Sequence, residues 1–168
     1  MRIGHGYDAH RFDESGEQTK PFIIGGIEIP YDRSLLAHSD GDVLIHALCD
    51  ALLGALGRGD IGHHFPDTDP QFKNIDSAEL LSHVMNLLSE EGWHLGNADL
   101  TILAQAPKMA PHIQAMRLRL AQLLNASEAQ VNIKASTTEG MGFVGRKEGI
   151  ETYASVLICR DQYTSGEY

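Results

Sequence analysis

The sequence predicts a single two-layer α+β domain, in which helices cover one face of a mixed β-sheet, and three observations favour this class. The chain has 168 residues, which suits one domain over residues 1–168 rather than two large ones. Its hydrophobic and charged fractions, 42% and 21%, are typical of a globular protein. Segments with the two-residue period of strands alternate with segments of helical period, and no repeat or linker separates them.

Several segments have the alternation of a strand. Residues 2–12 alternate large side chains with Gly4 and Gly6, so we expect a strand that another element approaches closely. Residues 22–29 are apolar but are interrupted by two adjacent glycines, which predicts a hairpin. The other predicted strands are residues 98–104, 131–135 and 150–160.

Three segments have helical spacing. The first follows Ser39 or Asp40, either of which could cap it, and ends at Gly57. The second begins at Asp76 and runs to Glu91. A third, over residues 113–124, follows a proline-rich stretch. The non-periodic stretches between elements, residues 58–74 and 137–149, are predicted loops of the kind that carries function.

Charge and composition exclude several classes of partner. The chain has 13 basic and 23 acidic residues, a net charge of −10, which disfavours binding to nucleic acids or anionic membranes. No apolar run approaches the roughly 20 residues of a membrane span, and the N-terminal sequence does not resemble a signal peptide, so we expect a cytoplasmic protein. Cys49 and Cys159 lie far apart in apolar patterns, and both are predicted to be buried thiols.

Histidines and carboxylates near the N-terminus suggest a metal site. Asp8 and His10 are two residues apart on a strand, so their side chains share a face. In the first helix and the residues before it, positions 38, 42, 46 and 50 are His or Asp and form a stripe predicted to face away from the apolar one, with His46 as the third ligand. Two histidines and an aspartate would leave one position of a tetrahedral zinc open. The alternative is that each histidine is simply hydrogen-bonded.

Two further stretches suit a phosphorylated ligand. His38 precedes a helix N-terminus, where backbone N–H groups attract anions, although Ser39 and Asp40 could simply cap that helix. The glycine-rich residues 134–149 could wrap a phosphate while Glu139 binds a divalent cation.

The acidic loop around residues 60–69 leaves two interpretations open. Its carboxylates, Asp60, Asp67 and Asp69, could accept hydrogen bonds from sugar hydroxyls or hold magnesium. They could equally serve only as turn formers beside proline.

Five separated segments together resemble one known family. They are RIGHGYDAHRF, LLAHSDGDVLIHALCDALLGAL, GDIGHHFPDTDP, AQAPKM and KASTTEGMGFVGRKEG, and their order and spacing are those of the 2-C-methyl-D-erythritol 2,4-cyclodiphosphate synthases of non-mevalonate isoprenoid biosynthesis. The resemblance covers nearly the whole chain. It implies a ferredoxin-like fold that assembles as a homotrimer with active sites between subunits.

The resemblance also implies roles for individual residues. Asp8, His10 and His46 match zinc ligands, with Asp8 and His10 also touching substrate, and Glu139 matches the ligand of a second cation, Mg²⁺ or Mn²⁺. His38 and Thr137 match catalytic positions, beside the reacting phosphate and the transition state. The implied sugar-binding residues are Asp60, Ile61, Gly62, Phe65, Pro66, Asp67, Thr68 and Asp69. The implied cytosine-binding residues are Ala104, Gln105, Ala106, Pro107, Lys108, Met109 and Ala110. The other implied substrate contacts are His38, Ser39, Ser136, Thr137, Thr138, Glu139, Phe143 and Arg146.

The implied reaction is an intramolecular phosphoryl transfer. The 2-phosphate of 4-diphosphocytidyl-2-C-methyl-D-erythritol 2-phosphate attacks the β-phosphorus and CMP leaves, which makes the enzyme a phosphorus–oxygen lyase. Arg146 from each subunit is expected to ring an axial cavity that could take an isoprenoid diphosphate. Ser136, Ala110 and the pair Gly140-Met141 depart from the residues common in the family.

Two other functions use parts of the same residue set. A zinc-dependent phosphohydrolase would release phosphate instead of a cyclic product. A non-catalytic metal or nucleotide sensor would need neither Thr137 nor Glu139.

Overall fold

The contact between the first strand and the first helix organises the fold. In the computed structural model, which describes residues 1–15, 20–66, 69, 72 and 74–160, strand β1 (Arg2–Arg11) lies directly against helix α1 (Val43–Leu56). A Cβ at Gly4 or Gly6 would lie 1.8 or 1.9 Å from a carbonyl oxygen of α1, at Ala51 or Ala47. The close approach predicted from the two glycines is therefore confirmed.

The remaining elements follow the predicted order. After β1 and α1, the larger ones are α3 (Ser77–Glu90), β4 (His94–Leu103), α4 (Ile113–Leu123), β5 (Val131–Ser136) and β6 (Gly149–Cys159). The short ones are β2 (Ile23–Ile24), β3 (Ile27–Glu28), α2 (Ile61–His64), η2 (Ala110–His112), η3 (Glu128–Gln130) and α5 (Gly142–Gly145).

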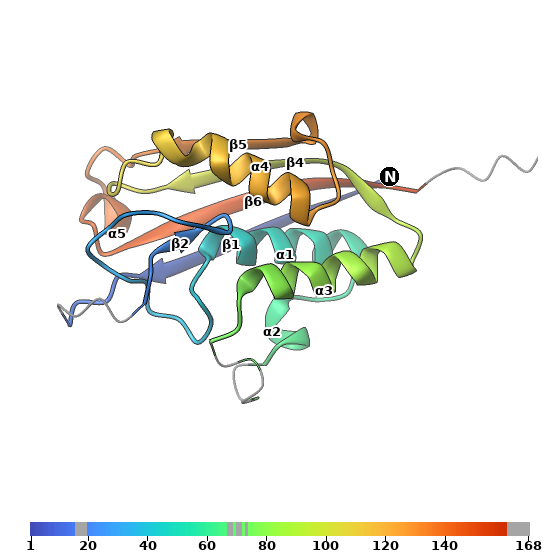
Figure 1. Cartoon of the computed structure of the whole chain (residues 1–168), viewed down its shortest axis with the longest axis horizontal. Coiled ribbons are helices and arrows are strands. Elements are labelled where there is room, and N and C mark those ends of the chain that lie inside the picture. The colour runs from blue at the N-terminus through green and yellow to red at the C-terminus, as the bar shows by residue number, and fades with distance from the viewer. Residues whose placement is uncertain (16–19, 67–68, 70–71, 73, 161–168) are drawn as a thin grey trace, which may run out of the picture.

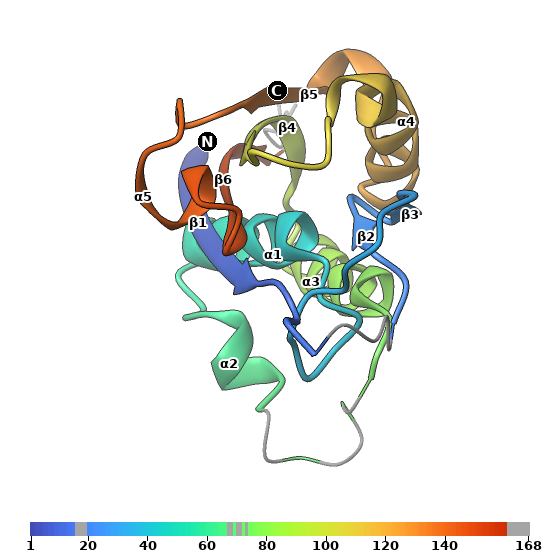
Figure 2. The ribbon, with the colours of Figure 1, turned by 90° about the vertical axis from the view of Figure 1, so that its left-hand side faces the viewer.

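Four strands form the mixed sheet that the sequence predicts. Their order is β1-β6-β4-β5, with β6 antiparallel to both of its neighbours and β5 parallel to β4. Helices α1, α3 and α4 lie on one side of the sheet, and the end-on view shows the two layers (Figures 1 and 2). The α+β class with helices on one face is confirmed.

The apolar core lies between the sheet and these helices. Along β6, Ile150, Ala154 and Val156 point into it and are almost fully buried. The opposite face of the sheet is open in the single chain, where Ile3 is 80% and Tyr7 46% exposed. Among the described residues no helix combines the length and apolar composition that crossing a membrane requires.

Helix α1 is more buried than its pattern predicts. We expected a polar stripe facing away from an apolar one, but 12 of the 14 residues of α1 are buried, including His46. The sheet, α2 and α3 surround the helix, and residues rich in Leu and Ala give it no wholly polar side. Of the predicted stripe, Asp42 and His46 are therefore buried and serve specific contacts, whereas Asp50 is half-buried and His38, before the helix, is exposed.

The cap of α1 also differs from the expectation. Neither Ser39 nor Asp40 caps the helix, because Gly41 adopts a left-handed conformation (φ 82°) and the helix starts after Asp42. The buried carboxylate of Asp42 accepts hydrogen bonds from the N–H groups of Leu44 and Ile45, and from those of Gly25 and Gly26 in the β2–β3 turn. One side chain thus joins the predicted hairpin to the helix.

Three smaller expectations are wrong. The predicted loops 58–74 and 137–149 contain the short helices α2 and α5. Cys49 is buried as expected, but Cys159 is partly exposed because it lies on the open side of β6, near the end of the strand.

Candidate metal centre

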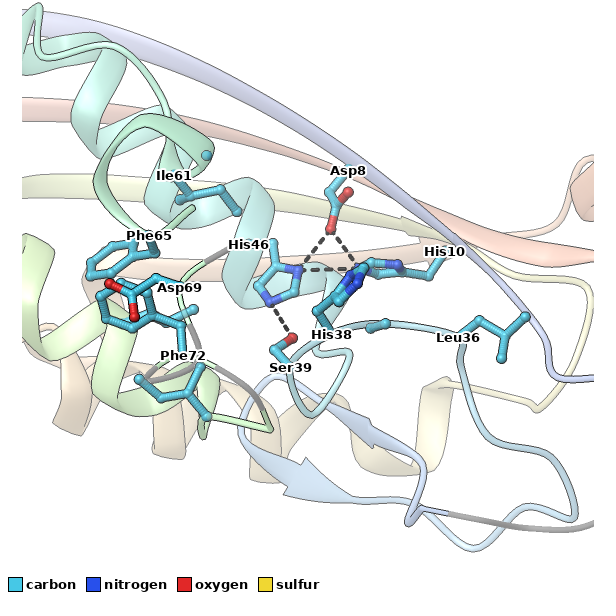
Figure 3. Close-up of a pocket in the computed structure, with 14 residues that line it drawn as sticks. Asp8, His10, Leu36, His38, Ser39, His46, Ile61, Phe65, Asp69 and Phe72 are labelled. Carbon is cyan, nitrogen blue, oxygen red and sulfur yellow. Dashed lines mark hydrogen bonds and ion pairs between the residues drawn. The ribbon is translucent and has the colours of Figure 1, made fainter. Parts of the chain in front are cut away.

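Three side chains converge at the end of β1. One carboxylate oxygen of Asp8 lies 3.1 Å from Nε2 of His10 and 3.0 Å from Nδ1 of His46, and the two imidazole nitrogens are 3.2 Å apart (Figure 3). Asp8 and His10 point from the same face of β1 because they are two residues apart, and His46 reaches them from the first turn of α1. The sequence-predicted group Asp8, His10 and His46 is therefore brought together and can hold a divalent metal ion.

The charges within this group support each other. Burial alone would raise the pKa of Asp8, but the hydrogen bonds with His10 and His46 outweigh burial and hold the pKa well below its usual range. Burial alone would lower the pKa of His46, but the hydrogen bond and charge of Asp8 raise it. A cluster that attracts a proton in this way also attracts a metal cation, which competes with protons for the same ligands.

The far side of the His46 ring is held by serines. Its Nε2 atom lies 3.1 Å from Oγ of Ser39 and 2.9 Å from Oγ of Ser77, the first residue of α3. Ser77 is fully buried, so this contact anchors the imidazole between two helices. Ser77 was not among the predicted site residues.

A cavity of about 720 Å³ adjoins the three ligands. Besides them, eleven other residues line it, among them His38 and Ser39 (Figure 3). The implied contacts that line it are His38, Ser39, Ile61, Gly62, Phe65 and Asp69. The lining residues that sequence reasoning missed are Leu36, Ala37, Phe72, Ile75 and Leu80.

The missed residues form the apolar wall of the cavity. The ring of Phe65 packs edge-on against Phe72, with their centroids 5.3 Å apart. The one signal that could have indicated such residues is an aromatic side chain in a loop otherwise rich in Gly, Asp and Pro, and it applies to Phe72. Leu36 and Ile75 gave no signal of this kind.

Other residues implied for sugar binding have different positions. Asp60 caps α2 by accepting a hydrogen bond from the backbone N–H of His63, and it does not line the cavity. Pro66 is exposed. Asp67 and Thr68 lie outside the described residues.

A second group of implied residues gathers at the far edge of the sheet. The backbone N–H of Ala104 donates to the carbonyl of Ser136, and that of Gly140 donates to the side-chain oxygen of Gln105, at 3.0 and 3.4 Å. The Thr137 hydroxyl donates to the exposed carboxylate of Glu139 at 2.6 Å. The segment 104–110 thus adjoins the loop that follows β5.

The sheet register separates these two groups within one chain. Ala9 pairs with Glu151, Glu151 with Leu103, and Leu103 with Ser136, so both groups lie at the same end of the sheet. They are nevertheless three strand spacings apart, on the order of 14 Å. Thr137 and Glu139 are consequently not part of the cavity around His46.

Arg146 and Phe143 lie on or beside α5. The guanidinium of Arg146 donates two hydrogen bonds to the carboxylate of Glu148, at 2.7 and 3.1 Å. Phe143 is part of α5 and is half-buried.

Known proteins resemble this chain over nearly its whole length. Residues 1–159 match the YgbB family. A protein of Pseudoalteromonas atlantica named 2-C-methyl-D-erythritol 2,4-cyclodiphosphate synthase is 65% identical over 158 residues, 94% of this chain and 95% of its own. One of the same name from Azotobacter vinelandii is 61% identical over 158 residues, 94% of this chain and 98% of its own.

A solved structure extends the likeness to the whole fold. The Plasmodium falciparum protein IspF, in a complex with CDP, superposes with a TM-score of 0.83 at 34% identity, over 96% of this chain and 97% of its own. Sequence and fold thus agree over nearly the full length, and the chain belongs to the YgbB family, together with proteins named 2-C-methyl-D-erythritol 2,4-cyclodiphosphate synthase.

Proposed function

We propose that this chain converts 4-diphosphocytidyl-2-C-methyl-D-erythritol 2-phosphate into 2-C-methyl-D-erythritol 2,4-cyclodiphosphate and CMP, as a phosphorus–oxygen lyase. The observation that carries the proposal is the group of Asp8, His10 and His46 beside a cavity of about 720 Å³ that His38 and Ser39 also line. The names of the relatives supply the product, and the CDP complex of a structural neighbour supports a cytidine nucleotide as part of the substrate.

The ligand set favours zinc. Donor atoms on a tetrahedral zinc, about 2.0–2.1 Å from the ion, lie about 3.3 Å from each other. The three donor atoms of Asp8, His10 and His46 are 3.0–3.2 Å apart, so small movements would fit them around one ion. Such an ion would neutralise phosphate charge at its open position and make the phosphorus more electrophilic.

Glu139 is the proposed ligand of a second cation, Mg²⁺ or Mn²⁺. Its carboxylate is exposed, and carboxylate oxygens are the ligands that hard cations such as Mg²⁺ and Mn²⁺ prefer. The hydroxyl of Thr137, 2.6 Å away, lies where it could donate to a phosphate held by that cation.

The residues around the cavity would hold the charged phosphates of the substrate in position and would form no covalent bond with them. A 2-phosphate oxygen, already ionised at neutral pH, forms the new bond to the β-phosphorus, while the bond from that phosphorus to the oxygen of CMP breaks. We assign His38 and Thr137 to contacts with the reacting phosphates. The aromatic wall of Phe65 and Phe72 would exclude water that could otherwise hydrolyse the diphosphate.

The other implied contacts would hold the ends of the substrate. Residues 104–110 would bind the cytosine through backbone groups, and the Asp69 side of the cavity would accept the sugar hydroxyls. Arg146 would meet a diphosphate in an axial cavity only by exchanging its present partner, Glu148. The cytoplasmic location stays a prediction, which cell fractionation tests.

We also propose a homotrimer with sites between subunits. Its support is that one chain keeps the metal group and the Thr137–Glu139 loop on the order of 14 Å apart, across three strand spacings. A neighbouring chain could bring its own loop to the metal group. The open sheet face, with Ile3 80% exposed, is the surface such an assembly would bury.

The test of the proposed reaction is a product analysis. The purified protein, loaded with zinc and magnesium, is incubated with the diphosphocytidyl substrate and followed by phosphorus NMR. We expect signals of a cyclic diphosphate and of CMP in equal amounts. Release of inorganic phosphate would instead identify a phosphohydrolase, and binding without turnover would identify a sensor.

A further inference from the structure

The two ring nitrogens of His46 face different partners. Nδ1 points to Asp8 and His10, at 3.0 and 3.2 Å, whereas Nε2 points to the hydroxyl of Ser77 at 2.9 Å and to that of Ser39 at 3.1 Å. A neutral imidazole has one nitrogen with a proton and one with a lone pair. His46 can ligate a metal through Nδ1 only if the remaining proton stays on Nε2.

Ser77 has only one proton to donate, and its surroundings decide where that proton goes. The Ser77 hydroxyl lies 2.5 Å from a carboxylate oxygen of Asp40, and an ionised carboxylate can only accept. The hydroxyl proton is therefore directed to Asp40. The lone pairs of the Ser77 oxygen are left to accept from Nε2–H of His46.

Asp40 is itself held in place at both oxygens. One accepts a hydrogen bond from the backbone N–H of Ser77 at 2.9 Å, and the other from that of Asp42 at 3.1 Å. Because Ser77 opens α3 and Asp42 caps α1, the start of each helix fixes the carboxylate. The full burial of Ser77 keeps water from competing for these bonds.

We propose that Asp40 and Ser77 are positioning residues, which hold the proton of His46 on Nε2 through a directed chain of hydrogen bonds and so present the Nδ1 lone pair to the metal. This inference rests on the proposed metal-dependent function and adds two residues outside the ligand set. It predicts that metal affinity depends on the direction of the hydrogen bonds from His46 through Ser77 to Asp40, as well as on the presence of these side chains.

Two substitutions break the chain in different ways. Ser77→Ala removes the nearer of the two hydroxyl oxygens that can accept from Nε2–H, and it leaves the Ser39 hydroxyl, which among the described residues has no contact with Asp40 to fix its direction. Asp40→Asn keeps the shape, but its NH₂ group must face either the Ser77 hydroxyl or the Ser77 backbone N–H, so it reverses or breaks the chain. Ser82→Ala is the matched control, because Ser82 lies on the same helix and its hydroxyl donates to the carbonyl of Ala78, away from His46.

Zinc affinity, measured by competition with a chromophoric chelator, is the first readout. We expect a loss of ten- to a hundred-fold in Ser77→Ala and in Asp40→Asn, the range typical of residues that orient metal ligands, and no loss in Ser82→Ala. Circular dichroism of the metal-free proteins establishes that each variant is folded. Unchanged zinc affinity in both folded variants would overturn the proposal.

The second readout is the proton position itself, and it needs no variant. Long-range proton–nitrogen NMR of the zinc-loaded protein with labelled histidine should place the His46 proton on Nε2 and the metal on Nδ1. A proton on Nδ1 would overturn the proposal even if Ser77→Ala failed to fold. Wild-type protein that binds no zinc would instead contradict the proposed function, so the two failures are distinct.

Discussion

A single methyl group decides whether β1 and α1 can pack. We expect Gly6→Ala to destabilise the protein by about 3 kcal/mol or more, because the added carbon would lie 1.9 Å from the carbonyl oxygen of Ala47 and the helix backbone would have to move. Urea denaturation measures the loss.

Gly54 offers a control at the same contact. A Cβ there would meet its nearest neighbour, the carbonyl oxygen of His5, at 3.9 Å, which is an ordinary distance. Gly54→Ala should therefore leave the fold intact and raise stability by about 0.5 kcal/mol, since alanine is the better helix former. Equal stability of the two variants would contradict a steric origin.

Asp42 links pH to stability. Burial raises its pKa to about 6, although the backbone N–H groups of Gly26, Gly25 and Ile45 act against this shift. A pKa above the value of 3.8 for a free aspartate means that the folded state retains the proton longer than the unfolded state does. The stabilisation is thus complete below about pH 4 and is lost as the pH rises through about 6.

The comparison with Asp42→Asn isolates this effect, because asparagine does not titrate. The variant should be less stable than the wild type, since its NH₂ group would face an N–H of the hairpin turn. The wild-type advantage should be largest near pH 4 and shrink by up to about 3 kcal/mol by pH 7. Urea denaturation at several pH values measures it, and an advantage that grows with pH would mean that the backbone N–H donors outweigh burial.

At the scale of single residues, the sequence predicted the metal-capable group of Asp8, His10 and His46 but not the residues that hold it in place. Asp8 and His10 follow from the two-residue period of a strand, and His46 from the four-residue spacing of His and Asp through the first helix. Ser77 lies 31 residues beyond His46, and no local pattern joins the two. Their contact exists only because α3 packs beside α1.

At the level of elements, predictions succeeded where one face dominates a segment. Strand β1 and the sheet strands have a clear alternation, and their bounds were predicted within a few residues. Helix α1 has apolar residues on nearly every side, so its periodicity could not show that it is enclosed. Helix α2 has only four residues, too few to have a period at all.

Helix α2 owes its position to α1. The carboxylate of Asp50 accepts a hydrogen bond of 2.7 Å from the backbone N–H of Ile61, and Ile61 and Gly62 line the cavity. We expect Asp50→Ala to release α2 and raise KM for the substrate about tenfold, because the net hydrogen bond to a charged group contributes about 1.5 kcal/mol. Zinc affinity should change much less than KM, since Asp50 makes no hydrogen bond with the ligand group and interacts with Asp8 and His46 only through its charge.

Asp50→Asn tests whether the hydrogen bond from Ile61, and not the charge of Asp50, holds α2 in place. Its amide oxygen can still accept from Ile61, so its KM should stay near the wild-type value. Steady-state kinetics measures KM, and hydrogen exchange of residues 58–65 measures directly whether α2 is released. If Asp50→Asn is as impaired as Asp50→Ala, the charge of Asp50 matters and its hold on α2 does not explain the loss.

At the level of the whole molecule, the implied residues fall into two groups that a single chain keeps apart. Residues 104–110 and the loop after β5 contact each other, as do Asp8, His10 and His46, but the register keeps the two groups three strands apart. Sequence resemblance assigned both groups to one substrate. It also implies that the segment around Lys108 and the loop at Thr137 come from the neighbour of the chain that supplies the metal group, and the strand order adds the distance that one chain alone leaves between them.

Mixing two inactive variants tests the shared site. His46→Ala removes a metal ligand and Thr137→Ala removes the loop hydroxyl, so each homotrimer should lack activity. In a mixed ring of three chains, one interface joins an intact metal group to an intact loop. A random equal mixture should therefore recover up to about a quarter of the wild-type activity, since about three quarters of its trimers are mixed and each has one intact site of three.

Native mass spectrometry must first establish that subunits exchange. Full activity at monomeric mass, or no recovery after proven exchange, would overturn the shared site, because each chain would then have to close the gap of on the order of 14 Å on its own.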